Sequence, residues 1–210
     1  MDRKGILLVV SGFSGAGKGT LMKELVSRYD NYALSISATT RSPREGEVDG
    51  REYFFRTKEE FEQMIADEAL IEHACYVGNY YGTPRAYVEE QLALGRDVIL
   101  EIEIQGALQI KKRFPDTLLL FVSTPDAETL KNRLIGRGTE SLDVVEKRLS
   151  RASEEAEGIE NYDYLVINDD LDICVEEVHQ MIRNEHLTIA RNEKAITQMR
   201  EELKGFLKGE

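Results

Sequence analysis

The feature that most constrains this chain is a glycine-rich run between an apolar stretch and a helical pattern. Residues 12–20 read GFSGAGKGT; the apolar run Ile6–Val10 precedes them, and Leu21, Leu25 and Val26 follow at helical spacing. Glycines let backbone N–H groups approach phosphate oxygens, and the start of a helix favours negative charge. A glycine-rich turn with a solvated lysine would share the composition but would not need this strand–loop–helix order. We therefore predict a loop that binds nucleotide phosphates.

Lys18 is the charged residue of this loop, and we predict that its ammonium group contacts the β- and γ-phosphates of ATP. The next position, where Ser or Thr commonly binds the metal, is Gly19, and the hydroxyl comes one residue later at Thr20. Direct ligation of Mg²⁺ by the protein is therefore not predicted; phosphates and water should hold the ion. The Gly-Lys-Gly-Thr form is common in small-molecule and nucleoside monophosphate kinases. The residues expected to bind ATP here are Gly12, Ser14, Gly15, Ala16, Gly17, Lys18, Gly19 and Thr20.

Composition and charge exclude several classes of function. A net charge of −12 disfavours a general nucleic-acid or anionic-membrane binder, because such surfaces need a dominant basic field. Cys75 and Cys174 lie far apart, so we expect buried free thiols rather than a disulfide or a zinc site. No apolar stretch approaches the roughly 20 residues of a membrane-spanning helix. We expect a soluble, cytoplasmic protein in which phosphate is bound locally.

Short apolar runs separated by helical patterns predict an α/β fold with a central parallel sheet, because such strands are buried on both faces. The chain has 210 residues and fits one compact domain. We predict a three-layer core formed by residues 1–36, 96–127 and 157–210. Residues 37–95 should form an inserted subdomain, and residues 128–156 a short lid. The strands are expected at Ile6–Val10, Asp97–Ile104, Thr117–Ser123 and Tyr164–Ile167.

Capping patterns predict where several helices begin. Thr57 and Glu60 form a capping box. A helix should start at Pro84 behind the cap Thr83 and end at Gly95, and another should run from Pro125 to about Arg133 behind Thr124. A further helix is expected from about Leu142 to Glu157. The apolar residues Ile196, Met199, Leu203 and Leu207 predict a C-terminal helix that packs on the core.

Between and beyond these elements, several segments together resemble the guanylate kinase family. They occur in family order and cover the chain up to about Arg191. The segments are Ser35–Arg44, Gly46–Phe55, Ile71–Ala74, Gly78–Thr83, Glu101–Gly106, Arg133–Thr139 and Val166–Asp170. The resemblance implies reversible transfer of the γ-phosphoryl group of ATP to GMP, and by extension to dGMP, giving ADP and GDP with Mg²⁺.

The residue types in these segments suit GMP. Arg41 and Arg44 can bind a monophosphate, with hydroxyl hydrogen bonds from Tyr53 and Tyr81. The N1–H and N2–H₂ donors of guanine call for a carboxylate, and its O6 calls for hydroxyl donors. Glu72 fits the first need, and Ser37 and Thr83 fit the second. Taken singly, these residues also suit surface charge, a solvated strand or ordinary packing, but the resemblance assigns the same positions to GMP.

Two more positions carry expectations from the family. Glu103, where the family often has aspartate, should contact the amino side of guanine and help to order water on Mg²⁺, near Thr20; its side chain is one methylene longer. Asn168 matches a position near the adenine of ATP, although capping of a strand end is an equal alternative. GMP is thus expected to contact Ser37, Arg41, Arg44, Tyr53, Glu72, Tyr81, Thr83 and Glu103.

Direct transfer requires two anionic phosphates to meet in line, so positive charge must offset their repulsion. Arg133, Arg137 and Arg148 are expected to close over the transferring group from the lid and, with Lys18 and Arg41, to form the catalytic set; Arg133 and Arg137 would also contact ATP. Arg148 could instead be a solvated helix residue. Closure of the subdomain and lid should exclude water.

Two alternatives stay open at the level of sequence. A ribose bisphosphate kinase on the same scaffold would not need the guanine-reading set. A non-catalytic guanylate-kinase-like module that binds proteins typically has a degraded phosphate loop, whereas Lys18 and its loop are intact here. The oligomeric state is not predicted.

Overall fold

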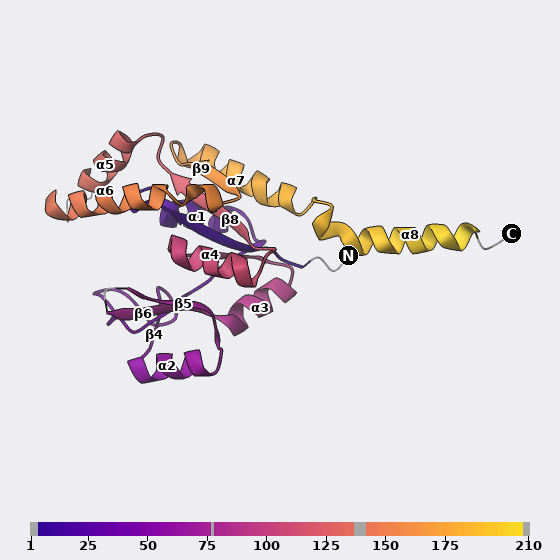
Figure 1. Cartoon of the computed structure of the whole chain (residues 1–210), viewed down its shortest axis with the longest axis horizontal. Coiled ribbons are helices and arrows are strands. Elements are labelled where there is room, and N and C mark those ends of the chain that lie inside the picture. Colours follow the sequence, from indigo (N-terminus) through magenta and orange to yellow (C-terminus); the bar gives the residue numbers. More distant parts are fainter. Residues whose placement is uncertain (1–3, 77, 137–141, 208–210) are drawn as a thin grey trace.

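A computed structural model describes residues 4–76, 78–136 and 142–207 (Figure 1). In this part of the chain the main sheet has five strands in the order β2-β7-β1-β8-β9. Every pairing in it is parallel, which confirms the predicted central sheet. Its strands are β1 (Leu7–Gly12), β2 (Tyr32–Leu34), β7 (Asp97–Glu101), β8 (Leu118–Ser123) and β9 (Tyr164–Ile167).

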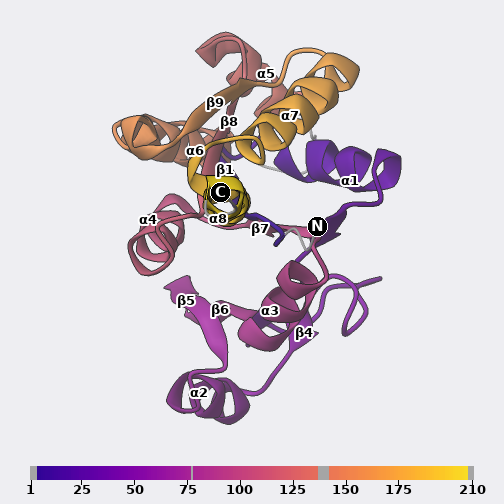
Figure 2. The same cartoon turned by 90° about the vertical axis from the view of Figure 1, so that its right-hand side faces the viewer.

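Helices cover both faces of this sheet, as Figure 2 shows. Side chains of β1 alternate between the two faces: Leu8 and Val10 pack with helices α1 and α7, whereas Leu7 and Val9 pack with α3 and α4. This alternation explains why β1 is apolar at four successive positions, from Leu7 to Val10, rather than at every second one. The helices are α1 (Lys18–Arg28), α3 (Arg85–Ala93), α4 (Ile104–Arg113) and α7 (Leu171–Glu185). The predicted three-layer α/β fold is confirmed.

A second, smaller sheet lies beneath the main one and has the order β4-β3-β6-β5 (Figure 1). Helix α2 (Lys58–Ala66) covers it through Phe61, and the predicted capping box of Thr57 and Glu60 starts this helix. The strands are β3 (Ala38–Thr39), β4 (Phe54–Phe55), β5 (Leu70–Tyr76) and β6 (Asn79–Pro84). This unit falls within the segment predicted as a subdomain; the exact domain limits stay a prediction.

Helices α5 (Ala127–Gly136) and α6 (Leu142–Ala156) pack on each other through Leu130, Leu134 and Val145. Both helices reach the phosphate loop: a Cβ atom at Gly15 would lie 2.9 Å from the Leu134 side chain of α5, and Arg148 of α6 contacts Ser14. The predicted cap of α5 is wrong, because the Asp126 carboxylate, not Thr124, accepts the hydrogen bond from a backbone N–H of the first turn.

Three other local predictions are wrong. Thr83 does not cap α3: Pro84 occupies that position, and the Thr83 hydroxyl donates to Glu72 instead. Cys75 is exposed rather than buried.

The third concerns the C-terminal helix, α8 (Glu193–Leu207), which exists as predicted but projects from the body instead of packing on the core (Figure 1). Two 3₁₀ turns, η1 (Ile159–Asn161) and η2 (Ala190–Asn192), complete the described elements.

Candidate nucleotide site

The glycine-rich loop connects β1 to α1 as predicted. Gly17 is the N-cap residue of α1 and has φ of 90°, a left-handed conformation that favours glycine. A Cβ atom at Gly12, whose φ is 149°, would lie 2.1 Å from the Val122 carbonyl oxygen, so no larger residue fits between the strands there. Lys18 is the first residue of α1, and its Nζ donates to the carbonyls of Gly12 at 2.7 Å and Phe13 at 3.1 Å. The lysine thus lies across the mouth of the loop, at the positive end of the helix.

Asn168 braces the back of this loop. It is 6% exposed, and its side-chain amide donates to the Ala16 carbonyl at 2.8 Å. Its backbone N–H donates to Ser123, which continues the pairing of β9 with β8. A Cβ atom at Gly17 would lie 2.5 Å from the Asn168 amide nitrogen. The contact with the loop is direct, and a role beside adenine stays a prediction.

Two of the three predicted lid arginines reach the loop. Arg148 of α6 donates from Nη1 to the Ser14 hydroxyl at 2.9 Å, so it is not simply a solvated helix residue. Arg133 of α5 makes a longer contact, with Nη1 3.5 Å from the Ala16 carbonyl oxygen. Arg137 lies outside the described residues.

The predicted phosphate-binding arginines lie at the edge of the smaller sheet. Arg41 places Nη2 at 2.9 Å from both carboxylate oxygens of Glu47, and its guanidinium carbon lies 5.3 Å from the centroid of the Tyr53 ring. The Arg44 backbone N–H, rather than its side chain, also donates to Glu47. This backbone hydrogen bond is the main reason that the pKa of Glu47 is lowered, and Arg41 adds to it against the opposing effect of burial.

The rings of Tyr53 and Tyr81 meet edge to face, with their centroids 6.0 Å apart. Burial raises the pKa of Tyr53, and the negative charges of Glu101 and Glu47 add to this effect, whereas Arg41 opposes it. Glu101 is the last residue of β7, beside the phosphate loop. The pKa of its carboxyl group is raised, because burial outweighs the opposing effect of Lys18. Tyr53 and Lys18 are therefore both close enough to Glu101 to interact electrostatically, which links the two halves of the site.

A buried carboxylate lies in the same small sheet. Glu72 of β5 is 7% exposed and accepts a hydrogen bond of 2.8 Å from the hydroxyl of Thr83, which is fully buried on β6. Burial raises the pKa of Glu72, and the hydrogen bonds from Thr83 oppose that rise. A Cβ atom at Gly106 would lie 3.5 Å from the second carboxylate oxygen, which places Glu72 beside the first turn of α4. Ser37 precedes β3 in the same sheet.

Sequence reasoning missed the partners of these residues. Arg151 of α6 donates from Nη2 to Glu103 at 2.6 Å and from Nε to Glu155 at 2.9 Å, and Glu103 is the N-cap residue of α4. Arg148 and Arg151 are three residues apart, so a helix places both on one face, and this spacing was the available signal. Glu47 could have been suspected from its position three residues after Arg44. Neither signal indicates which charge each residue meets.

The predicted site residues therefore gather around two centres. The first is a glycine loop at the start of a helix, with a lysine and two arginines on it. The second is a small sheet that carries arginine and tyrosine side chains and a buried carboxylate. Together with the parallel sheet, they define the class of α/β proteins that bind nucleotide phosphates on a loop between β1 and α1.

Comparisons with known proteins identify the family within this class. The guanylate kinase family model matches residues 4–185. A guanylate kinase of Bacillus anthracis is 52% identical over 203 residues, covering 96% of this chain and 99% of that protein. One of Lactococcus lactis is 48% identical over 191 residues, covering 91% and 93%. The crystal structure of guanylate kinase from Anaplasma phagocytophilum superposes with a TM-score of 0.74 at 30% identity, over 90% of each chain. The chain belongs to the guanylate kinase family.

No helix in the described ranges is long and apolar enough to cross a membrane. Within the same ranges, no cluster of three or more His, Cys, Asp or Glu side chains is arranged to hold a metal ion. The Glu101 carboxylate lies beside the phosphate loop, because a Cβ atom at Gly19 would lie 3.7 Å from one of its oxygens. Glu103 follows two residues later, and Thr20 lies in the first turn of α1. Such a sparse set suits Mg²⁺, which usually keeps several waters and binds through one or two carboxylates and substrate phosphates.

Proposed function

We propose that this protein is a GMP kinase, which reversibly transfers the γ-phosphoryl group of ATP to GMP. A buried carboxylate recognises the guanine base of the acceptor. The observation that carries the proposal is the hydrogen-bonded pair of Glu72 and Thr83, buried in the small sheet that also presents Arg41, Tyr53 and Tyr81. A carboxylate there can accept both N1–H and N2–H₂ of guanine. Adenine presents a bare acceptor at N1 and would leave that charge unpaired, which strongly disfavours it.

On the donor side, the loop amides and Lys18 bind the phosphates of ATP, together with Ser14 and Thr20. Arg133, Arg137 and Arg148 offset the negative charge that gathers as the two substrates meet. Arg148 supports this role because it already contacts Ser14 of the loop. Asn168 acts on the same site from behind, through Ala16.

On the acceptor side, Arg41, Arg44, Tyr53 and Tyr81 bind the phosphate of GMP. Ser37 donates to O6 of guanine. Thr83 was expected to share that task, but its hydroxyl has one proton, and that proton is donated to Glu72. We therefore assign Thr83 to orienting Glu72 rather than to O6.

The remaining assignments complete the proposal. Glu103 contacts the amino side of guanine. Thr20, Glu101 and Glu103 would lie near Mg²⁺, which phosphates and water would largely hold and which would neutralise charge between the bound phosphates. No nucleic-acid ligand is proposed, because the net charge of −12 repels one. We place the protein in the cytoplasm, where ATP and GMP are available to it.

A panel of acceptors tests the proposal. Purified protein is incubated with ATP, Mg²⁺ and either GMP, dGMP, AMP, CMP or UMP, and the ADP formed is measured. GMP should be phosphorylated and AMP, CMP and UMP should not; equal use of AMP would contradict the guanine assignment. Glu72→Ala should lose GMP selectivity more than ATP binding, whereas Lys18→Ala should abolish transfer to every acceptor.

The same assay addresses the alternatives. A ribose bisphosphate kinase would ignore GMP, and a protein-binding module would form no ADP with any acceptor. The intact loop with Lys18, and the full-length similarity to proteins named guanylate kinase, favour the kinase over both.

A further inference from the structure

Gly106, in the first turn of α4, is a glycine that its backbone conformation does not require. Its φ lies outside the left-handed region that favours glycine, whereas the φ of Gly17 in the phosphate loop lies inside it. Alanine stabilises a helix more than glycine does, so an ordinary helix position favours the larger residue. Gly106 is also buried, so a side chain there would meet its neighbours. A glycine of this kind indicates that space is needed beside the helix.

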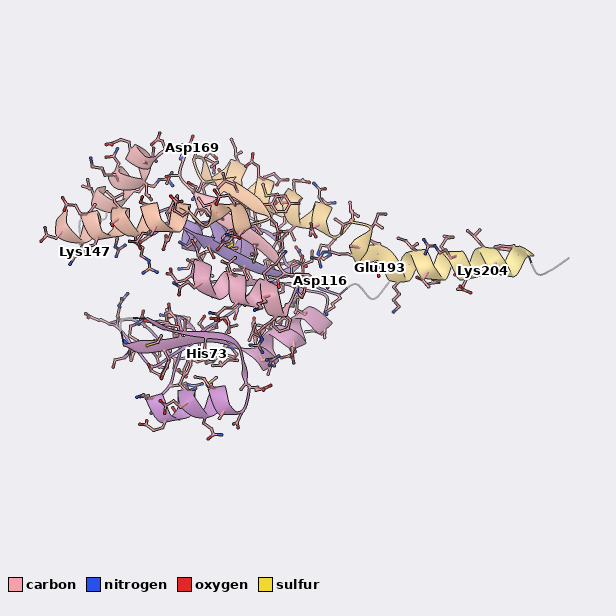
Figure 3. The ribbon with its side chains drawn as sticks, in the orientation of Figure 1. His73, Asp116, Lys147, Asp169, Glu193 and Lys204 are labelled. Atoms are coloured by element: carbon pink, nitrogen blue, oxygen red, sulfur yellow. The ribbon has the colours of Figure 1, made fainter. Side chains whose placement is uncertain are left out.

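Helix α4 lies between the main sheet and the smaller sheet, and it contacts both β1 and β5 (Figure 3). Its buried residues Ala107 and Ile110 pack with the apolar side chains of the main sheet. Gly106 faces Glu72 of β5 instead, because its Cβ direction points to that side chain. Figure 3 labels His73, the residue that follows Glu72 on β5. Gly106 therefore lies where the core meets the sheet that carries the proposed acceptor site.

A methyl group fits at Gly106, and it would touch Glu72. A Cβ atom there would lie 3.5 Å from Oε2 of Glu72 and 3.4 Å from Cδ1 of Ile102. Both distances are van der Waals contacts rather than clashes. The hydrogen of glycine therefore leaves one side of the Glu72 carboxylate open, and a single methyl group would close it.

Oε2 is the oxygen of Glu72 that remains for a ligand. The Thr83 hydroxyl donates to the other oxygen, Oε1, at 2.8 Å, and no other side chain in the described ranges donates to this carboxylate. Glu103, which is assigned above to the amino side of guanine, is the N-cap residue of α4 and precedes Gly106 by three residues. The N-cap residue and the residue three positions later are neighbours at the start of a helix. Glu103 and Oε2 of Glu72 thus border the same turn of α4.

The start of α4 also favours a negative charge on Glu72. The first turn has no acidic side chain, and Glu103 does not cap it, because the Glu103 carboxylate is paired with Arg151. The partial positive charge of the helix N-terminus therefore acts on the nearby Glu72 carboxylate. An oxygen that is charged and open on the side of α4 is a suitable acceptor for an amino group.

We propose that Gly106 determines selectivity for the 2-amino group of the acceptor base, because it leaves the space in which that group reaches Oε2 of Glu72. The inference rests on the proposed function and extends it to a residue outside the sets assigned above. The Glu72 carboxylate selects guanine over adenine, and the space at Gly106 selects guanine over hypoxanthine, which has no 2-amino group.

Gly106→Ala tests the inference, with GMP and IMP as separate acceptors. GMP loses a hydrogen bond to a charged group, whereas IMP has no amino group to lose. The preference for GMP over IMP, measured as the ratio of their kcat/KM values, should fall by about 10-fold or more. The KM for ATP should stay within about twofold of wild type. A purely structural defect would instead lower kcat/KM for both acceptors alike.

Gly158→Ala is the matched control. It adds the same methyl group beside the same helix, because a Cβ atom at Gly158 would lie 3.6 Å from Cγ2 of Ile104. Its φ of −113° lies outside the left-handed region, so alanine is not strained there. The new contact is with Ile104 and not with Glu72, so the preference for GMP over IMP should stay within about twofold of wild type.

Gly106→Ser is a second variant at the same position. It has the same Cβ atom and adds a hydroxyl group, so it should lower the preference for GMP over IMP at least as far as Gly106→Ala does. Far-UV circular dichroism and urea unfolding show whether each variant is folded. A Gly106→Ala protein that does not fold would contradict the room for a methyl group.

Three results would overturn the inference and leave the proposed function intact. They are an unchanged preference in Gly106→Ala, a wild-type preference in Gly106→Ser, and an equal loss of preference in Gly158→Ala. A wild-type protein that does not phosphorylate GMP would overturn both.

Discussion

The hydrogen bond from Thr83 to Glu72 offers the sharpest test of the acceptor site. Replacing Thr83 with valine removes the hydroxyl and keeps a similar shape in a position that is fully buried. The Glu72 carboxylate then loses a donor at 2.8 Å in surroundings with little water to replace it. The proposed binding of guanine depends on that carboxylate being charged and correctly oriented.

The expected magnitude follows from the type of bond. Hydrogen bonds to charged groups contribute about 1.5–3 kcal/mol, which corresponds to a factor of roughly 10–150 in binding. The KM for GMP should therefore rise by about 10- to 150-fold, while the KM for ATP stays nearly unchanged. Thr83→Ser keeps the donor and is the matched control, and it should stay within several-fold of wild type.

The pH dependence provides a second readout. Burial raises the pKa of Glu72, and Thr83 lowers it again by hydrogen bonding to the charged form. In the proposed site the charged form binds guanine, so kcat/KM for GMP should fall as the pH drops through the pKa of Glu72. Without the Thr83 hydroxyl that pKa is higher, so Thr83→Val should move this acidic limb to higher pH.

Steady-state kinetics with GMP and ATP varied separately, from about pH 5 to about pH 9, measure both effects. An equal loss for GMP and ATP, or an acidic limb that does not move, would show that Thr83 does not act through Glu72. The stability of the folded protein depends on pH in the opposite sense to the activity with GMP. A carboxyl group whose pKa is raised on folding lowers the free energy of unfolding as the pH rises through that pKa. Thr83→Val should therefore destabilise the free protein more at neutral than at acidic pH.

Three further substitutions give independent tests. Glu47→Gln removes the charge paired with Arg41 and should lower the KM for GMP by up to about fivefold, since partly exposed pairs contribute at most about 1 kcal/mol; a higher KM would show that Glu47 orients the arginine. Arg151→Gln removes the partner of Glu103, and IMP lacks the amino group assigned to Glu103, so the preference for GMP over IMP should fall by less than about fivefold. An unchanged preference would exclude an effect of Arg151 through Glu103. Thr117→Val should raise the free energy of unfolding in urea by about 1 kcal/mol, because the Thr117 hydroxyl is buried without a partner among the described residues, and a decrease would contradict this.

The main sheet could be predicted because its strands are apolar on both faces, a pattern that little else produces. Strand β2 was missed because it has three residues, too few to show a pattern. The position of the glycine-rich loop could be predicted to the residue, because the local backbone conformation there requires glycine. Caps were less predictable. Thr83 and Thr124 both have suitable hydroxyls, but the Thr83 hydroxyl donates to Glu72, and Asp126 rather than Thr124 caps α5.

For the candidate site, the sequence predicts which residues take part, and their roles stay predictions, whereas the protein partner of each residue could not be predicted. Arg151 meets Glu103 across 48 residues of chain, and Asn168 meets Ala16 across 152. Spacing within a helix places a side chain on a face but does not say what that face meets. The same limit applies to α8, whose period predicted a helix and left its covering undetermined.

The sequence did not predict the protein groups that pair with the cations of the candidate site. These groups share one property: a bound substrate would have to displace them or share the cation with them. Lys18 donates to two loop carbonyls, Arg41 is paired with Glu47, and Arg148 donates to Ser14. Each cation is thus held in place by the protein before an anion arrives, which limits the entropy lost on binding and prevents the cations from repelling one another. Binding is then an exchange of partners, so the net gain per phosphate contact is smaller than the full charge would suggest. We therefore expect discrimination between acceptors to come from a group that water cannot reach, and the buried carboxylate of Glu72 is the group that the proposal assigns to this task.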